Sequence, residues 1–297
     1  MVYRPAAGRG TAPGKAEALT AAMHCPYADL YIYRIEGRWD SRAAVGGPSF
    51  LGHWQEEGSS FLFYLAPADA EVRMILRDQP QLRLLDSCHM PYDQWQGTIF
   101  TAEPIGRFFI VPAWQDPVPA DAAAETLLPI VLDPGVVFGA GNHPTTRDCL
   151  QALDLSAAEG PAGTVLDLGT GTGILALAAA RLGSPRVLAV DLNLLAARTA
   201  ARNVRLNRLT DSILVVQGRA EEAIDCPAEL LVANLHGDVM LRLIDTGGFR
   251  QKRRFILSGL LRGDAKEVRN RLTRSGARIV EEWVRDGIWH TFYGMRA

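Results

Sequence analysis

The pattern of hydrophobic and polar residues changes near Asp133, and this change divides the chain into two parts. Beyond Asp133, short β-favouring runs alternate with Ala-, Leu- and Arg-rich segments, which is typical of a parallel sheet with crossover helices. The five strands predicted by this pattern are residues 164–168, 186–190, 213–217, 230–233 and 255–258.

The C-terminal end of the chain has a different pattern. Residues 277–284 and 289–295 are two expected strands, and the short connection between them contains Asp286-Gly287. This pair favours a tight hairpin turn. We therefore predict an α/β fold whose parallel sheet ends in an antiparallel hairpin.

The part before Asp133 predicts a smaller α+β unit. Residues 29–36 and 60–65 combine aromatic and β-branched residues as strands do, and residues 68–77 are typical of a short helix. Residues 107–111 and 127–132 are further expected strands, and prolines break regular structure between them. The predicted division is a flexible tail over residues 1–22, a small domain over 23–93, a linker over 94–130 and the α/β domain over 131–297.

Composition limits the class of protein. The 297 residues are 48% hydrophobic and 22% charged, which is ordinary for a globular protein. The longest apolar runs are far shorter than the roughly 20 residues that a membrane span needs, and the first residues do not form a secretory signal. The net charge of −2 lacks the basic excess of most nucleic-acid binders, so we do not expect direct nucleic-acid binding.

The four cysteines lie far apart, at positions 25, 88, 149 and 226, without the close pairing that metal sites use. We expect buried, reduced thiols, no bound metal and a cytoplasmic location, although a disulfide between distant cysteines stays open.

The most informative motif is V-L-D-L-G-T-G-T-G-I-L over residues 165–175, between a predicted strand and a predicted helix. Its glycines are Gly169, Gly171 and Gly173. Glycine is needed where a strand turns tightly into a helix and the backbone approaches a ligand, and the helix N-terminus supplies free N–H groups. The motif therefore predicts a Rossmann-like cofactor loop.

The spacing of this motif favours S-adenosylmethionine over a dinucleotide. A dinucleotide fingerprint would place its third glycine at Ile174. Asp167 would repel a pyrophosphate but attract an amino group, so we expect it to orient a methionine moiety. Asp191 ends the next strand, where a carboxylate can accept hydrogen bonds from both ribose hydroxyls. The alternative to cofactor binding is a structural role, in which the glycine loop is only a tight turn and Asp191 is a solvated acid at the end of a strand.

These residues resemble class I S-adenosylmethionine-dependent methyltransferases, and two further motifs resemble the PrmA family. L-D-P-G-V-V-F-G-A-G-N-H-P-T-T-R over residues 132–147 is similar to that family's D-P-G-x-x-F-G-T-G-x-H-x-T-T, and V-A-N-L over residues 232–235 to its A-N-[IL]. The resemblance implies that Thr145 and Asn234 contact the cofactor and that Phe138 flanks the same pocket.

The resemblance begins near Gln94. The sequence departs from the family motif at two positions: Ala140 replaces the family's threonine, and Asn142 precedes the histidine. Both put the identity of the substrate in question. The family methylates the eleventh protein of the large ribosomal subunit and carries an N-terminal ferredoxin-like domain that recognises it. The resemblance therefore implies that residues 23–93 form this substrate-recognition domain and that the partner is a large-subunit ribosomal protein.

Methyl transfer is an in-line displacement that needs alignment and a dry site. A lysine acceptor, with a pKa of about 10.4, must lose a proton, and burial beside a sulfonium would lower that pKa. Asn234 is our candidate catalytic residue, holding the amine in line. The structural alternatives are that Asn234 is a turn residue at the end of a strand and that Thr145 caps the next helix.

Several other residues receive structural or minor roles. His143 is expected to be a structural loop residue, His236 is a slightly better candidate base, and Trp283 and Trp289 are expected in the core.

We therefore predict a protein methyltransferase acting on lysine or α-amino groups. Methyltransferases of another protein, a small molecule or nucleic acid are the alternative, although the chain has N-L-H-G at residues 234–237 where amino-methylating DNA enzymes have [DN]-P-P-[YF]. A non-catalytic module on the same fold is a further alternative, and cofactor affinity would discriminate it. The methylated residue, the number of methyl groups and the oligomeric state stay undetermined.

Overall fold

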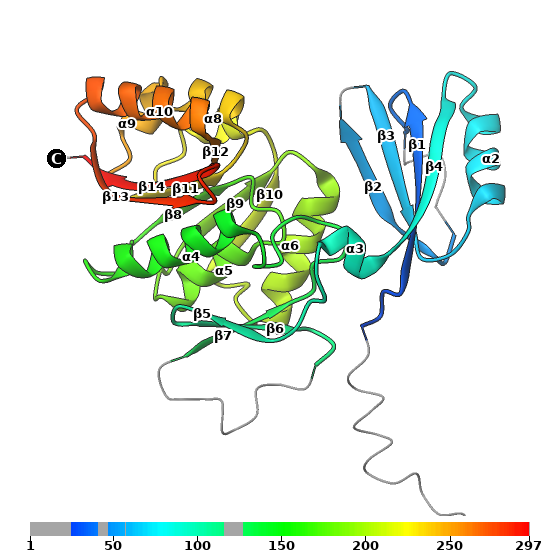
Figure 1. Cartoon of the computed structure of the whole chain (residues 1–297), viewed down its shortest axis with the longest axis horizontal. Coiled ribbons are helices and arrows are strands. Elements are labelled where there is room, and N and C mark those ends of the chain that lie inside the picture. The colour runs from blue at the N-terminus through cyan, green and yellow to red at the C-terminus, as the bar shows by residue number, and fades with distance from the viewer. Residues whose placement is uncertain (1–24, 41–46, 57, 116–126, 297) are drawn as a thin grey trace, which may run out of the picture.

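The computed structural model describes residues 25–40, 47–56, 58–115 and 127–296 (Figure 1). Its largest sheet has the strand order β10-β9-β8-β11-β12-β14-β13. The first five strands are parallel, and β14 pairs antiparallel with both β12 and β13. The strands are β8 Val165–Leu168, β9 Val187–Asp191, β10 Ile213–Gln217, β11 Leu230–Asn234, β12 Arg254–Leu261, β13 Arg278–Arg285 and β14 Trp289–Met295. The predicted α/β fold with its C-terminal antiparallel hairpin is confirmed.

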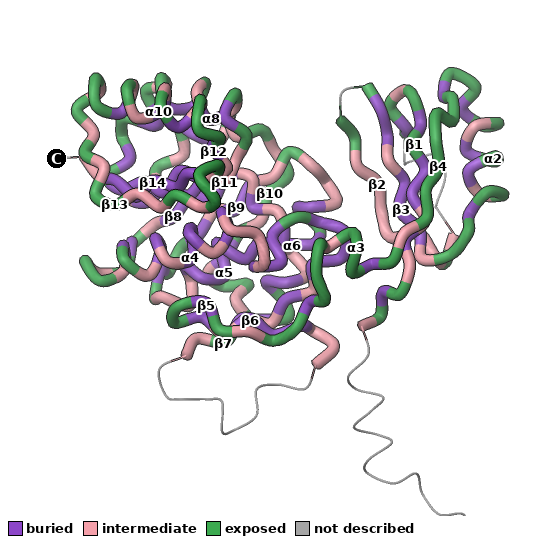
Figure 2. The backbone as a smooth tube through the Cα atoms, viewed as in Figure 1, coloured by how far each residue is buried: buried purple, intermediate pink, exposed green. Residues whose placement is uncertain are grey.

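Helices cover both faces of this sheet, and Figure 1 shows them as layers above and below it. The first face packs on α4 Pro144–Ala157, α5 Ile174–Arg181 and α6 Leu194–Leu206. The second packs on α7 Ala220–Ala223, α8 Gly237–Leu243, α9 Gly247–Arg250 and α10 Arg262–Arg274. Because both faces are covered, all four residues of β8 are buried, as Figure 2 shows for the centre of the sheet.

The described part of the segment that we predicted as a linker is folded. It contains α3 Tyr92–Gln96 at its start and a three-stranded sheet of β5 Glu103–Ile105, β6 Phe108–Pro112 and β7 Leu128–Leu132. Phe108, Ile110, Ile130 and Leu132 are fully buried in the core shared with α4 and α5. These strands therefore complete the core of the α/β unit and are not an extended connection, because the apolar side chains of β6 and β7 need a partner surface. Pro117, Pro119 and the predicted tail over residues 1–22 lie outside the described residues.

The N-terminal sheet has the order β2-β3-β1-β4 with all neighbours antiparallel. Its elements are β1 Asp29–Glu36, β2 Phe50–Glu56, β3 Ser59–Tyr64, α2 Asp69–Asp78 and β4 Arg83–Pro91. The sequence predicted β1, β3 and α2, but not β2 and β4. Eight of the nine residues of β4 are exposed, so this edge strand lacks the alternation that reveals a half-buried strand. Between β1 and β4 the described residues contain one helix, α2, and the ferredoxin-like assignment of residues 23–93 stays a prediction.

The N-terminal sheet packs against the α/β unit. Val136, which belongs to the loop after β7, lies in one buried cluster with Tyr27, Leu30, Phe63 and Tyr92. β2 also lies on α6, because a Cβ atom on Gly52 would be 2.5 Å from the side chain of Leu195.

The structure also tests the expectations about membranes and cysteines. No described helix is long and apolar enough to span a membrane. All four cysteines are free, but only Cys149 is buried, and Cys88 is exposed on β4. The expectation that all four are buried is therefore wrong.

Candidate cofactor and acceptor site

The glycine loop joins β8 to α5 at the carboxyl edge of the sheet. Gly171 has a φ of +57°, and a Cβ atom there would lie 2.6 Å from the carbonyl oxygen of Phe138. The loop of residues 133–143 therefore lies directly on the glycine loop. Thr172 strengthens this contact, because its backbone N–H donates to the Phe138 carbonyl at 3.2 Å and its hydroxyl to the Gly139 carbonyl at 2.7 Å. Sequence reasoning assigned the glycines to ligand approach, whereas the structure shows that packing between two loops also requires glycine.

Asp191 stands at the carboxyl end of β9, beside the glycine loop. Its Oδ2 accepts from the Gly171 N–H and its Oδ1 from the Asn193 N–H, both at 2.9 Å. Burial raises the pKa of Asp191, and the two N–H donors oppose this shift. The side chain is half-buried, so each oxygen, with one donor bound, keeps a lone pair for a further donor such as a ribose hydroxyl.

Asp167 lies underneath the same loop, at 1% relative exposure. Its Oδ2 accepts from the Thr170 hydroxyl at 2.6 Å, and its Oδ1 has no partner of hydrogen-bond geometry among the described residues, although the Ala176 backbone N–H helps to lower the pKa of the carboxyl group. Desolvation raises the pKa of Asp167 to about 7, with a smaller contribution from the charge of Asp191. A buried acceptor without a donor fits an amino group placed on the loop. The direct contact with a methionine moiety stays a prediction, because the carboxyl group is covered.

Thr145 and Asn234 are far apart in sequence but in contact in the structure. The Asn234 side-chain N–H donates to the Thr145 hydroxyl oxygen at 3.2 Å, and that hydroxyl lies 2.7 Å from Nδ1 of His143. Nδ1 also accepts from the Thr145 backbone N–H, which caps α4. Burial lowers the pKa of His143, so its ring is neutral at pH 7 and Nδ1 is an acceptor. The Thr145 hydroxyl therefore donates to His143 and accepts from Asn234, which fixes the orientation of the Asn234 amide.

Aromatic side chains surround His143. Its ring is 5.1 Å from the ring of Phe138 and 5.2 Å from that of Trp289, in edge-to-face arrangements. Phe138 is 50% exposed and Trp289 is half-buried. The prediction that Trp289 lies in the core is therefore wrong, because the first residue of β14 reaches the site, whereas Trp283 packs on the core. His236 is the N-cap residue of α8, and its side chain makes no capping hydrogen bond.

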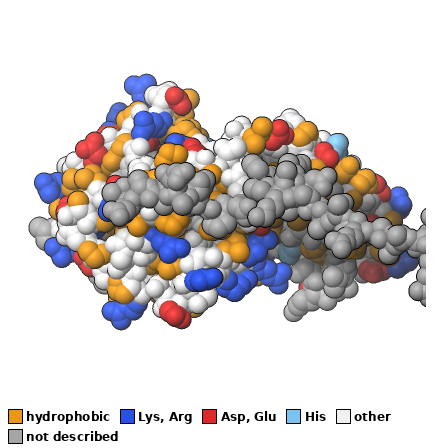
Figure 3. Space-filling view, turned by 90° about the horizontal axis from the view of Figure 1, so that it is seen from below, with side chains coloured by type: hydrophobic (Ala, Val, Ile, Leu, Met, Phe, Trp, Pro, Cys, Tyr) orange, Lys and Arg blue, Asp and Glu red, His pale blue; other side chains and the backbone are white. Residues whose placement is uncertain are grey.

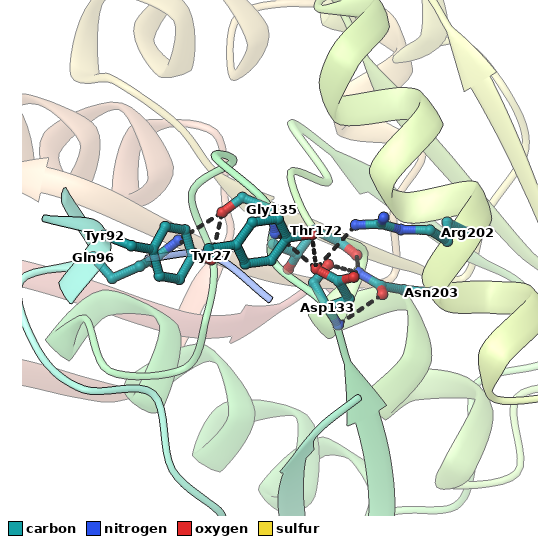
Figure 4. A network of polar contacts seen from close by, with 8 residues as sticks. All are labelled: Tyr27, Tyr92, Gln96, Asp133, Gly135, Thr172, Arg202 and Asn203. Atoms are coloured by element: carbon teal, nitrogen blue, oxygen red, sulfur yellow. Dashed lines mark hydrogen bonds and ion pairs between the residues drawn. The ribbon is translucent and has the colours of Figure 1, made fainter. Parts of the chain in front are cut away.

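A polar network links the N-terminal segment to both loops (Figure 4). The Asp133 carboxylate accepts from the Tyr27 hydroxyl at 2.8 Å and pairs with Arg202 at 2.9 Å. Asn203 is fully buried in α6. Its side-chain oxygen accepts from the Asp133 backbone N–H at 2.9 Å. Its side-chain amide donates to the Asp133 carbonyl at 3.1 Å and to the Thr172 carbonyl at 2.8 Å. Asn203 therefore holds the loop of residues 133–143 and the glycine loop together. Sequence reasoning missed it, and the available signal was an asparagine on the inward face of an Ala- and Leu-rich helix.

A cleft of 980 Å³ opens between the N-terminal sheet and the loop of residues 133–143. Aromatic rings line it, among them Trp54, Phe61, Trp95 and Phe138. His143 also lines it and is connected to Asn234 through the Thr145 hydroxyl. Its charged residues are Glu56, Glu103 and Arg147, and Arg147 pairs with Glu103 at 2.7 Å. The charge of Glu56 is left without a partner among the described residues, so the cleft favours a cationic side chain with an apolar stem.

The structure thus brings the predicted site residues to one edge of the sheet. Phe138, Thr145, Asn234, Asp191 and the three glycines lie on two adjoining loops and two strand ends, and Asp167 lies beneath them. Their roles toward a ligand stay predictions. No group of three or more metal-binding side chains is found among the residues described.

The strand order, the glycine loop after β8 and the acid at the end of β9 define the class I methyltransferase fold. Residues 92–297, which are more than half of the chain, match the family described as ribosomal protein L11 methyltransferase (PrmA), and the chain belongs to this family.

Individual relatives agree with this assignment. A ribosomal protein L11 methyltransferase of Anoxybacillus flavithermus is 41% identical over 187 residues, which cover 60% of this chain and 58% of the relative. One from Bacillus cereus is 38% identical over 189 residues, covering 60% of this chain and 57% of the relative. The match therefore spans less than two thirds of these relatives. The crystal structure of a ribosomal protein L11 methylase from Lactobacillus delbrueckii subsp. bulgaricus is 30% identical with a TM-score of 0.56, covering 66% of this chain and 99% of that one.

Proposed function

We propose that the protein is an S-adenosylmethionine-dependent methyltransferase that modifies amino groups of ribosomal protein L11. The observation that carries this proposal is the family match over residues 92–297, which includes both loops and every proposed site residue. The named relatives support the substrate, because they are L11 methyltransferases. The proposed place of action is the cytoplasm, where a ribosomal protein is made.

The residues present fit the proposed cofactor. Asp191 has free lone pairs at the strand end where a ribose would lie, and the Asp167 carboxylate provides a buried acceptor for an amino group. The N-terminus of α5 adds backbone N–H groups for a carboxylate. When bound, the cofactor would supply an electrophilic methyl group on a sulfonium.

The cleft residues would prepare the acceptor amine. A lysine amine is protonated at pH 7 and has to lose a proton before it can react. Aromatic walls desolvate the ammonium form and thereby lower its pKa, while Glu56 at the cleft wall attracts the charged form toward the site.

Asn234 is the proposed orienting group. Its amide nitrogen is engaged by Thr145, so the amide oxygen is left to accept an N–H bond from the acceptor. A neutral amide acceptor fixes the direction of the nitrogen lone pair without stabilising the charged amine as a carboxylate would. Asn234 therefore has the role of alignment and not of proton removal.

The test uses the full chain, purified L11 and cofactor with a radiolabelled methyl group. We expect label in L11, at lysine or α-amino positions identified by mass spectrometry, and an at least about 100-fold slower reaction with Asn234→Ala. Label in L11 at side-chain carboxylates, or in RNA or small molecules of a lysate with L11 unlabelled, would contradict the proposal.

A further inference from the structure

A second cavity, of 640 Å³, lies on the other side of the junction between the N-terminal sheet and the α/β unit. One wall is β2, with Phe50, Leu51 and His53, and the other is α6. The two cavities adjoin at Val136, which lines both, but the second contains none of the residues proposed for cofactor binding and catalysis.

The α6 wall of this cavity is basic. Arg198, Arg202 and Arg205 are spaced by four and three residues, which places them along one side of the helix. Arg202 is neutralised by Asp133 (Figure 4). Arg198 and Arg205 are exposed and have no acidic partner within the described ranges.

The sign of the charge distinguishes the two cavities. No Asp or Glu lines the second cavity, as far as the chain is described, whereas the first contains Glu56 and Glu103. Figure 3 shows Lys and Arg side chains gathered near the centre of the lower face, where Figure 1 places the lower end of α6. A cationic methyl acceptor would be repelled here, so this cavity favours an anion although the net charge of the chain is −2.

The β2 side supplies neutral donors and rings. His53 is half-buried, and burial followed by the charge of Arg198 lowers its pKa, so the neutral ring offers one N–H. Trp39 also lines the cavity at 2% relative exposure, and its indole N–H has no acceptor among the described residues. The half-buried ring of Phe50 lies beside them and offers a surface on which a base can stack.

We propose that this cavity binds a phosphate-bearing ligand through Arg198 and Arg205. The planar guanidinium group matches the geometry of phosphate oxygens and binds them with two parallel hydrogen bonds. The two arginines are two helical turns apart, about 10 Å along the axis. A ligand with two or more phosphates, either a small polyphosphate nucleotide or an RNA backbone, can place one phosphate on each guanidinium group.

The experiment measures binding by calorimetry to inorganic triphosphate, to ADP and to a single-stranded RNA of about ten nucleotides at several salt concentrations. The test variant is the double substitution Arg198→Ala and Arg205→Ala. The matched control is Arg186→Ala with Arg208→Ala, which removes the same two charges from exposed positions outside the cavity. Thermal unfolding establishes that both variants are folded.

We expect the test variant to bind about 10- to 100-fold more weakly and the control to bind within about twofold of the wild type. RNA binding that is tighter than ADP binding, with a salt slope of about −0.7 per phosphate that falls in the test variant, identifies an RNA backbone. Equal affinity for ADP and RNA identifies a nucleotide. The proposal is overturned if none of the three ligands binds, if both variants weaken binding equally, or if poly-glutamate binds as tightly as RNA. The result does not depend on the methyl-transfer activity.

Discussion

The substitution Asn203→Ala tests whether one buried amide couples the two loops of the site. Asn203 makes three hydrogen bonds to backbone groups, two to Asp133 and one to the Thr172 carbonyl. A hydrogen bond contributes about 1 kcal/mol net, so the free energy of unfolding should fall by about 3 kcal/mol. Urea unfolding measures this loss.

The effect on cofactor binding is smaller and more specific. The bond to Thr172 is the one that holds the glycine loop, and without it the ligand must order that loop itself. This requirement costs about 1 kcal/mol, which weakens S-adenosylmethionine binding about fivefold in a calorimetric titration.

Asn207→Ala is the matched control for this variant. Asn207 lies one helical turn later and is also buried. Its side-chain oxygen accepts from the Val131 N–H at 2.9 Å, and its side-chain amide donates to the Val131 carbonyl at 2.6 Å and to the Asn203 carbonyl at 2.8 Å. We expect a similar loss of stability, with cofactor affinity unchanged because Val131 belongs to β7 and not to the glycine loop. If both variants lose affinity equally, or if a folded Asn203→Ala binds the cofactor normally, the proposed coupling is refuted.

Three further predictions concern the cofactor site and the N-terminal domain. Asp191→Ala should weaken S-adenosylmethionine binding by about 1.5 to 3 kcal/mol, and titration of a folded variant with unchanged affinity would show that the acid makes no ligand contact. The raised pKa of Asp167, about 7, means that the folded state holds a proton that the unfolded state has lost, so stability should fall as pH rises from about 4 to about 7. Urea unfolding across this range should show a smaller fall for Asp167→Asn, and parallel curves would contradict the assignment. A chain beginning near Gln94 should keep β5, β6 and β7, fold and bind the cofactor, but lose most of the proposed activity on L11, because the proposed recognition surface is removed. If that shorter chain is as active as the full chain, residues 23–93 are not a substrate-recognition domain.

The sequence alone was sufficient for the large sheet of the α/β unit. Strands buried on both faces are continuous apolar runs, and the glycine loop needs residues without a Cβ atom, so both leave a local signal. The same holds for Asp191 and for the C-terminal hairpin, whose Asp286 and Gly287 have φ values of +54° and +65°. Each of these features is set by neighbours along the chain.

Tertiary structure decided what depends on partners distant in sequence. β4 is exposed along nearly its whole length, so only its pairing with β1 makes it a strand. Trp289 reaches His143 because the last hairpin returns to the sheet, and Asn203 bonds Asp133, which lies 70 residues away along the chain. The opposite charges of the two cavities likewise arise from which side chains of β2, α6 and the neighbouring loops face each other. Such contacts leave no periodic signal, because they depend on how separate elements pack and not on the local preference of any one of them.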